Sequence, residues 1–497
     1  MMTMKRNHTL PIKRIASYAL PVLLAITAGC GKSFLDVPPQ GQQPAEEFWK
    51  TEADATKAVN AIYANLHEWR QVAFAALAVE DLGSEETEKG SDPNDASFLS
   101  NFDNFTVTAS DGQVADFWKG QYQEVNLCNQ VLDSVPKIQM DDALKNRYLA
   151  EAKFVRAYAY FRLVRAYGDI PLRLHTPKGP EEYNLPRTPK AEVWAAIEKD
   201  LTEATAVLPA TYPAKDAGRA TKGAALALHA KVAMYQKKWQ DVFTFTNQVM
   251  GLGYSLFPDY EKLFRIANEN SVESVFEIQC QIILGNRDAS NSQYSQIQGV
   301  KSQQGGGWGF NTPTQALVDA YEPGDPRKNA TILFRGTINA EGDSIKNIGI
   351  NRRFNYKSYV PFGLFRDGYN EGADQNVRVI RYAEVLLMNA EAANELGNSG
   401  QALSSLNAVR ARARGGNNTI LPDVTTTDQA QLRLAIYHER QIELAMERDR
   451  FFDVIRQGRG AQVFGPLGFK AGKNELMPIP QVEIDLSSNK LTQNPGY

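Results

Sequence analysis

One uninterrupted stretch, residues 147–167 (RYLAEAKFVRAYAYFRLVRAY), constrains the fold more than any other part of the sequence. It contains no Gly or Pro and consists mostly of residues that favour helices, so it predicts a helix. Its side chains form two stripes at helical spacing: Tyr148, Ala152, Val155, Ala159, Leu163 and Ala166, and then Phe154, Tyr158, Phe161 and Arg165. Because a surface helix needs only one stripe, two stripes predict packing on two sides. Gly168 and Pro171 mark the predicted end of the helix.

Two pairs of predicted helices repeat one layout later in the chain. Residues 220–235 and 239–250 form the first pair, and residues 381–396 and 401–414 form the second. At an offset of about 160 positions the pairs match at Ala230/Ala390, Ala233/Ala393, Asn247/Asn407 and Val249/Val409. Small residues in the first helix facing an apolar second helix are typical of tetratricopeptide hairpins, which bury their faces by stacking. Further helices are predicted at residues 51–66, 111–135 and 188–207.

The helical period fades between residues 251 and 378. Phe276, Ile278, Cys280 and Ile282 alternate as in a strand, and polar stretches follow at residues 284–309 and 335–372. Another polar loop is predicted at residues 83–104. The predicted fold class is therefore mainly α, with tetratricopeptide-like helical hairpins packed against an irregular, loop-rich half that has a few short strands.

The helix predicted at residues 428–447 carries Glu439, Glu443 and Glu447 on one face. Like charges four residues apart disfavour an isolated helix, so we expect cations beside them. The cations nearest in the sequence are Arg440, Arg448, Arg450 and Arg456.

The first 29 residues are typical of a secretory signal. A basic start precedes the short apolar run 15–28, which is too short to span a bilayer. Thr27-Ala28-Gly29-Cys30 then resembles the lipobox of bacterial lipoproteins, in which the cysteine is lipidated. Lipidation of Cys30 would tether the protein to a membrane without a spanning helix; the alternative is an ordinary signal peptide with a chance cysteine. The other cysteines, Cys128 and Cys280, lie in apolar patterns that favour buried free thiols over a disulfide.

The sequence carries no catalytic signature that we recognise. His438-Glu439 lacks the second histidine of a zinc-protease motif, and no G-x-S-x-G or phosphate-binding glycine loop is present. A pair of glycosidase carboxylates depends on spacing in three dimensions and stays open. Loop acids at 92–95 and 367–374 lack EF-hand spacing and favour solvated acids over calcium ligands. With 54 basic and 57 acidic residues the chain has no nucleic-acid footprint. We expect no enzyme and no cofactor.

Aromatic residues in polar loops favour sugar binding, because pyranose rings stack on aromatic faces while polar neighbours bind the hydroxyls. Trp69, Tyr294 and Trp308 are the candidate ligand-binding residues. The alternative for each is a role in the core.

Several blocks in order resemble the SusD/RagB family of Bacteroidota surface lipoproteins. They are Cys30 followed by FLDVPP at 34–39, AEAKFVRAYAYFRLVRAYGDIPL at 150–172, WGFNTPTQALVDAYEPGDPR at 308–327, HERQIELAMERDRFFDVIRQGRG at 438–460, and the terminal LMPIP and QNPGY. The resemblance implies one compact body after a signal peptide at 1–29, with an N-terminal helical part at 30–250 and a C-terminal part at 251–497.

The same resemblance implies a non-enzymatic role at the outer face of the outer membrane. A lipid-anchored protein of this kind binds an oligomeric nutrient, most often a glycan, and delivers it to a SusC-like TonB-dependent transporter. The alternative is a peptide-binding or mainly structural lid of such a transporter, as in the RagB branch.

Overall fold

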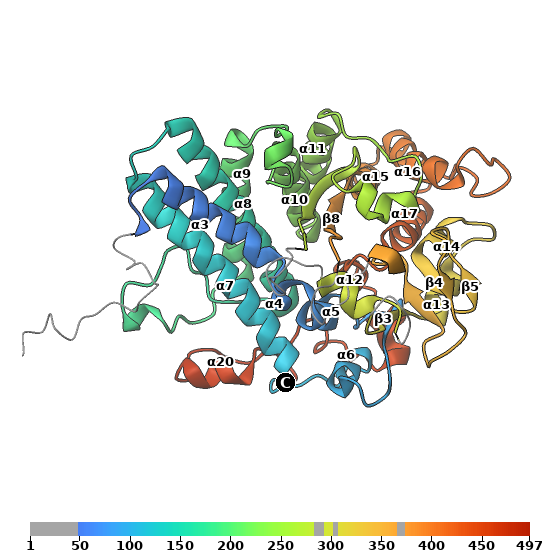
Figure 1. Ribbon diagram of the computed structural model, residues 1–497, viewed down its shortest axis with the longest axis horizontal. Coiled ribbons are helices and arrows are strands. Elements are labelled where there is room, and N and C mark those ends of the chain that lie inside the picture. The colour runs from blue at the N-terminus through green and yellow to red at the C-terminus, as the bar shows by residue number, and fades with distance from the viewer. Residues whose placement is uncertain (1–47, 283–292, 302–306, 365–372) are drawn as a thin grey trace, which may run out of the picture.

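In the computed structural model, long helices extend across the molecule, and short strands with irregular segments lie beside the later helices (Figure 1). The structure describes residues 48–282, 293–301, 307–364 and 373–497. The predicted signal peptide and Cys30 lie outside the described residues, as do Asp367 and Asn370 of the second group of loop acids. No helix among the described residues is long and apolar enough to cross a membrane.

The long helices confirm the predicted fold class. They are α3 (Glu52–Leu66), α7 (Gly112–Ser134), α8 (Asp142–Tyr167), α9 (Lys190–Val207), α10 (Lys222–Tyr235), α11 (Trp239–Met250), α15 (Tyr382–Glu395), α16 (Ser399–Arg414) and α17 (Gln429–Leu444). Each packs on the next in a continuous stack, and α11 packs on α15. The two hairpins whose sequences match, α10–α11 and α15–α16, are therefore neighbours, as tetratricopeptide-like stacking requires.

Short helices fill the spaces between the long ones. They are α4 (Trp69–Val72), α5 (Phe74–Glu80), α6 (Ser100–Asp103), α12 (Gln293–Gln298), α13 (Gln315–Ala320), α14 (Arg327–Thr331), α18 (Arg450–Arg456), α19 (Gly460–Phe464) and α20 (Gln481–Leu486). The predicted loop at 83–104 is more ordered than its polar composition suggested, because it holds a strand, the 3-10 turn η2 (Ser97–Leu99) and α6.

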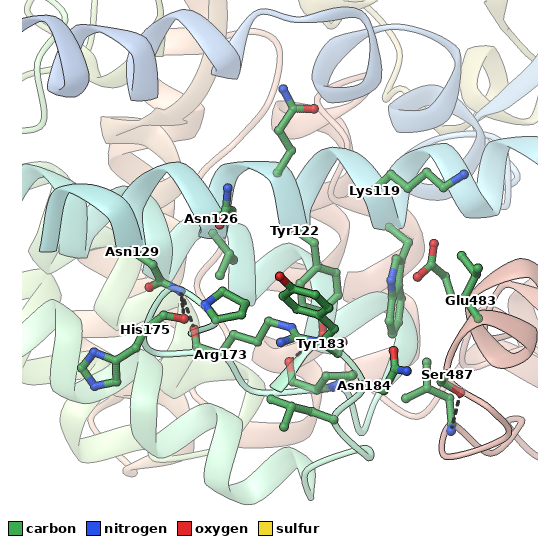
Figure 2. Close-up of a pocket in the computed structure, with 18 residues that line it drawn as sticks. Lys119, Tyr122, Asn126, Asn129, Arg173, His175, Tyr183, Asn184, Glu483 and Ser487 are labelled. Carbon is green, nitrogen blue, oxygen red and sulfur yellow. Dashed lines mark hydrogen bonds between the residues drawn. The ribbon is translucent and has the colours of Figure 1, made fainter. Parts of the chain in front are cut away.

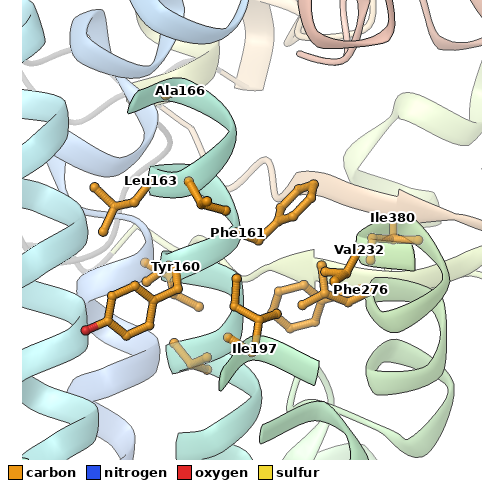
Figure 3. Close-up of a cluster of buried hydrophobic side chains, with 14 of the residues drawn as sticks. Tyr160, Phe161, Leu163, Ala166, Ile197, Val232, Phe276 and Ile380 are labelled. Carbon is orange, nitrogen blue, oxygen red and sulfur yellow. The ribbon is translucent and has the colours of Figure 1, made fainter. Parts of the chain in front are cut away.

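Helix α8 is buried on both sides, as its two stripes predicted. Tyr160 and Phe161 point to opposite sides of the helix (Figure 3). Tyr160 lies 6.5 Å from Tyr122 of α7, and Phe161 lies 5.2 Å from Tyr235 of α10, between ring centroids. Ala152, Ala159 and Ala166 are almost fully buried, which lets neighbouring helices approach closely. The helix ends at Gly168, whose φ of +74° suits glycine.

The strands of the described residues form four separate antiparallel pairs. β1 (Thr87–Gly90) pairs with β3 (Phe310–Pro313), and β2 (Ser274–Ile278) pairs with β8 (Val377–Arg381). β4 (Ile332–Phe334) pairs with β7 (Arg353–Asn355), and β5 (Thr337–Ile338) pairs with β6 (Ser344–Ile345). The strand predicted from the alternation of Phe276, Ile278, Cys280 and Ile282 is confirmed in part. β2 ends at Ile278, so Cys280 and Ile282 lie outside it, and β2 is buried on both faces rather than one. Cys128 and Cys280 are buried free thiols, as predicted.

The three glutamates of the late helix have cationic partners, but not those nearest in sequence. Glu439 pairs with Arg327 and Arg410, Glu443 with Arg327, Arg381 and Arg412, and Glu447 with Arg381 and Lys357. We call these residues, together with Glu273, which pairs with Arg381 and Arg412, the buried ion cluster. Burial alone would raise the pKa of Glu443, but the guanidinium groups of Arg412 and Arg381 help to lower it to about 2.

The arginines proposed from the sequence serve other carboxylates. Arg440 and Arg456 pair with Asp453, and Arg450 pairs with Glu85. The prediction of these partners is wrong for two reasons. Arg440 lies within α17 but directs its guanidinium to Asp453, and α17 ends at Leu444, so the chain turns away before the other three arginines.

Candidate ligand-binding site

Five aromatic rings meet where the helical half adjoins the irregular half. We call them the aromatic platform: Trp69, Phe74, Phe98, Trp308 and Phe310. The rings of Trp69 and Trp308 lie 5.9 Å apart between centroids, and Phe74 lies 6.0 Å from Trp308. The structure therefore brings together two of the three ligand-binding residues proposed from the sequence.

The pairing of β1 with β3 brings the distant segments of the platform together. Gly90 lies opposite Phe310, and the Ser91 backbone N–H donates to the Gly309 carbonyl at 2.7 Å. Gly90 has a φ of +68°, and a Cβ there would lie 2.5 Å from that same carbonyl oxygen. Only glycine fits this crossing, so Gly90 fixes the distance between the loop that carries Phe98 and the segment that carries Trp308.

Trp69 is the first residue of α4, which lies across α7. The Gln71 side chain donates to the Gly120 carbonyl at 2.8 Å, and the Arg70 guanidinium pairs with Asp116 at 3.1 Å. A Cβ on Gly120 would lie 2.9 Å from the Cβ of Arg70, so the two helices need glycine to approach this closely. The short helix is thereby held rigidly against the long one, with Trp69 at its free end.

The platform is graded from buried to exposed. Phe310 is buried and forms its base, Trp69, Phe74 and Trp308 are partly buried, and Phe98 is 41% exposed at its edge. Half-exposed aromatic faces at the junction of two substructures are typical of ligand sites. This arrangement can accept a flat, partly apolar molecular face.

Lys301 lies beside the platform and forms ion pairs with the loop acids Asp92 and Asp95. Its ammonium group lies 2.8 Å from Asp92 and 2.5 Å from Asp95, and it donates to the Ser91 hydroxyl at 2.7 Å. Its hydrogen bond, with that of Ser91, lowers the pKa of Asp95. A calcium ion would have to displace Lys301 from these acids, and among the described residues no group of three or more His, Cys, Asp or Glu is arranged to hold a metal.

Tyr294 does not join the platform. It lies in α12, is only 7% exposed, and is covered by the guanidinium of Arg448 at 4.9 Å from the ring centroid. Burial raises the pKa of Tyr294 to about 12. The polar stretch around it forms a short helix that turns the ring inward, so its face is closed to a ligand in this structure.

Sequence reasoning missed Phe74 and Phe98. Phe98 lies in the polar segment 83–104, so the argument that selected Trp308 would have selected Phe98 as well. Phe74 carries no such signal, because it begins an apolar helix and only its neighbours reveal its place.

Comparisons with known proteins match both halves of the chain. The model of the SusD family matches residues 272–497, and a model described as starch-binding associating with outer membrane matches residues 33–234. A SusD-like protein P2 from Formosa agariphila is 30% identical over 96% of this chain and 98% of that protein.

Solved structures share the fold. A laminarin binding SusD-like protein is 31% identical, with a TM-score of 0.79 over 90% of this chain and all of that chain. Surface glycan-binding protein A from Bacteroides thetaiotaomicron, solved with laminarihexaose, is 23% identical with a TM-score of 0.75 over 90% of this chain and all of that chain. The helical stack, the two family models and the full-length relative together show that the chain belongs to the SusD/RagB family.

Proposed function

We propose that this protein binds a glycan on the aromatic platform and does not transform it. The carrying observation is the meeting of Trp69 and Trp308 at 5.9 Å, from segments far apart in the chain and with faces partly open to solvent. A sugar ring presents an apolar C–H face that suits such a surface, and the laminarin-binding relative at 31% identity supports a glycan as the ligand class. Phe98 extends the surface at its exposed edge.

Membership of the family supports a proposal for the partner and the location. We infer that Cys30 carries a lipid, that the protein sits at the outer face of the outer membrane, and that it passes its ligand to a SusC-like TonB-dependent transporter. The N-terminal family model, described as associating with outer membrane, supports the location. Globomycin treatment, which blocks lipoprotein signal cleavage, tests the anchor: a Cys30→Ala variant should lose both membrane association and sensitivity to the drug.

Isothermal titration of the purified protein against a panel of soluble polysaccharides, laminarin included, tests the platform. We expect Trp69→Ala and Trp308→Ala each to weaken glycan binding at least tenfold, because each removes one stacking face. Trp239→Ala is the matched control, since this tryptophan is partly buried on α11 and is not part of the platform. It should bind as the wild type does.

A second panel of short peptides separates the alternative ligand class. Binding of peptides with no binding of any glycan would overturn the proposal in favour of a peptide-binding lid. Release of reducing sugar from the same polysaccharides would instead reveal a glycosidase.

A further inference from the structure

A second hollow lies on the other side of α7 from the aromatic platform. It has a volume of about 410 Å³ and is bounded by α7, by the segment 171–185 and by the C-terminal segment with α20 (Figure 2). This volume falls within the range of roughly 300–1,000 Å³ that is usual for small-molecule sites. We call it the α7 pocket.

Helix geometry places the two sites apart. Gly120 faces α4, which carries Trp69, whereas Trp118 and Tyr122 face the α7 pocket. Two residues along a helix correspond to a rotation of about 200°, so neighbours at ±2 point to the opposite side. A ligand in the α7 pocket therefore cannot touch the platform through α7.

The walls of the pocket are held in place by the protein itself. The Tyr122 hydroxyl donates to the Pro171 carbonyl at 2.7 Å, and the buried Asn129 amide donates to the Arg173 and His175 carbonyls. The Arg173 guanidinium donates to the carbonyls of Glu182 and Tyr183, which fixes the outer part of the segment. The pocket is thus formed before any ligand arrives.

Hydrogen bonds also hold the C-terminal wall of the pocket in place. The Asn494 amide donates to the Tyr167 carbonyl at 2.9 Å and to the Met477 carbonyl at 2.7 Å. Arg187 donates to the Asn494 side chain and to the Thr492 carbonyl at 3.0 Å, joining the two walls. This gives the terminal QNPGY block a structural role, since its asparagine caps the end of α8.

Three polar side chains of α7 face the pocket without a partner among the described residues. Lys119, Gln123 and Asn126 lie at spacings of four and three, hence on one face, and make no hydrogen bond or ion pair within the described chain. Figure 2 shows Lys119 and Asn126 on the α7 wall, with Glu483 near Lys119. Burial raises the pKa of Glu483, and the charge of Lys119 opposes that rise.

Apolar surface is exposed at the rim of the same pocket. Tyr183 is 57% exposed and Leu486 is 65% exposed, while Trp118 forms part of the floor and is 3% exposed. Exposed apolar side chains around a polar-lined hollow indicate a binding site rather than packing.

The hydrogen-bonding groups of the pocket suit a neutral ligand. Arg173 directs its N–H groups to backbone carbonyls, and His175 lies 2.7 Å from Asp133, so both side chains already have hydrogen-bond partners. Lys119 and Glu483 carry opposite charges, which partly offset each other. The remaining free groups, the amides of Gln123 and Asn126, both donate and accept hydrogen bonds, as hydroxyl groups do.

We propose that the α7 pocket is a second carbohydrate site, which binds one or two neutral sugar units with their apolar faces against Tyr122 and Tyr183. The pocket itself stands on geometry alone; the choice of carbohydrate as its ligand rests on the proposed function. A glycan chain could then be held at two separate points of the same protein, one on each side of α7.

The experiment titrates neutral disaccharides (cellobiose, maltose and laminaribiose) into the wild type and three variants. Asn126→Trp fills the pocket from an exposed helix position, and Asn146→Trp makes the same change at an exposed position of α8 outside it. Trp308→Ala disables the platform only. With the platform disabled by Trp308→Ala, we expect Asn126→Trp to weaken the remaining disaccharide binding at least tenfold, and Asn146→Trp in the same background to change it less than twofold.

Tyr183→Ala provides a second test if Asn126→Trp fails to fold. Tyr183 lies on a surface segment, so removal of its side chain should not destabilise the fold. It should weaken disaccharide binding at least fivefold. Absence of disaccharide binding, loss of binding in Trp308→Ala with retention in Asn126→Trp, or binding of peptides in place of sugars would each overturn the proposal. A result against the platform proposal alone would look different. Long glycans would then bind Trp308→Ala as they bind the wild type, while disaccharide binding would still be weakened by Asn126→Trp.

Discussion

The two halves of this protein are stabilised by different kinds of contact. In the helical half, α10 buries Ala224, Ala227 and Ala230 completely, and helices lie close because their contact residues are small. Where α16 and α17 adjoin the irregular half, the buried ion cluster places Arg327, Arg381 and Glu443 at 2% exposure or less.

This difference teaches where each half is vulnerable. A polar substitution at a small apolar contact is unfavourable. Stability is nevertheless lost gradually over several substitutions, since each contact contributes little. A buried ion cluster fails abruptly, because removing one partner leaves the others charged and without water. The following changes test that contrast.

Glu443→Ala should have the largest effect. It leaves Arg381 and Arg412 without one of their buried partners, and we expect it to lower the free energy of unfolding by about 3–5 kcal/mol. Urea denaturation followed by circular dichroism measures the change. Glu395→Ala is the matched control, because Glu395 pairs with Arg433 near the surface and should cost less than about 1 kcal/mol. Equal losses in the two variants would show that the cluster has no special role.

Glu124→Gln should change how stability of the helical half depends on pH. Burial raises the pKa of Glu124 to about 8, although Asn65 donates to it at 2.7 Å. The folded protein therefore holds a proton that the unfolded chain has released, so wild-type stability falls as pH rises from about 5 to 8. The amide cannot ionise, so the variant should avoid a loss on the order of 3 kcal/mol across that window.

Thermal unfolding of both proteins at pH 5 and pH 8 measures this effect. The two should have similar Tm values at pH 5, and the variant should be the more stable at pH 8. The same pH slope in both proteins would contradict the assignment of the proton to Glu124.

Ala159→Leu should destabilise the protein by about 1–3 kcal/mol, because Ala159 is fully buried in α8 and no space exists for three more carbon atoms. Ala143→Leu places the same side chain at an exposed position of the same helix and should change stability by less than about 0.5 kcal/mol. The difference in urea midpoint between the variants measures how tightly the helices pack. A tolerated Ala159→Leu would mean that the stack is looser than its buried alanines imply.

The smallest effect is expected at the seam between the halves. Trp308→Ala removes a partly buried ring and should cost about 1 kcal/mol or less, whereas Tyr294→Ala removes a buried ring and should cost about 3 kcal/mol or more. Differential scanning calorimetry compares the two. A larger loss for Trp308→Ala would identify its ring as core and weaken the case for the platform.

Periodicity was enough to predict the long helices. The stripes of α8, the hairpins at 222–250 and 382–414, and the strand near Phe276 were visible because burial repeats at the spacing of the local structure. The partners of Glu439 and Glu443 were not predictable this way, since Arg327 and Arg381 reach them through the tertiary fold and not through neighbouring sequence.

The candidate site shows the same division. Position in or just before a polar segment selected Trp69 and Trp308, yet it could not distinguish Trp308 from Tyr294, whose ring turns inward from α12. The α7 pocket could not be predicted from the sequence. Its walls come from residues 118–129, 171–185 and 483–491, and no local sequence pattern relates these segments.

The sequence by itself determined the helical class and the repeated hairpins, because these depend on the spacing of side chains along each element. It indicated the family through the resemblance of several blocks. Only the tertiary structure decided which aromatic faces meet, which ion pairs are buried and where hollows form. The physical reason is that a ring or a charge acquires its environment from segments hundreds of residues away, such as β1 and β3 at the Gly90 crossing.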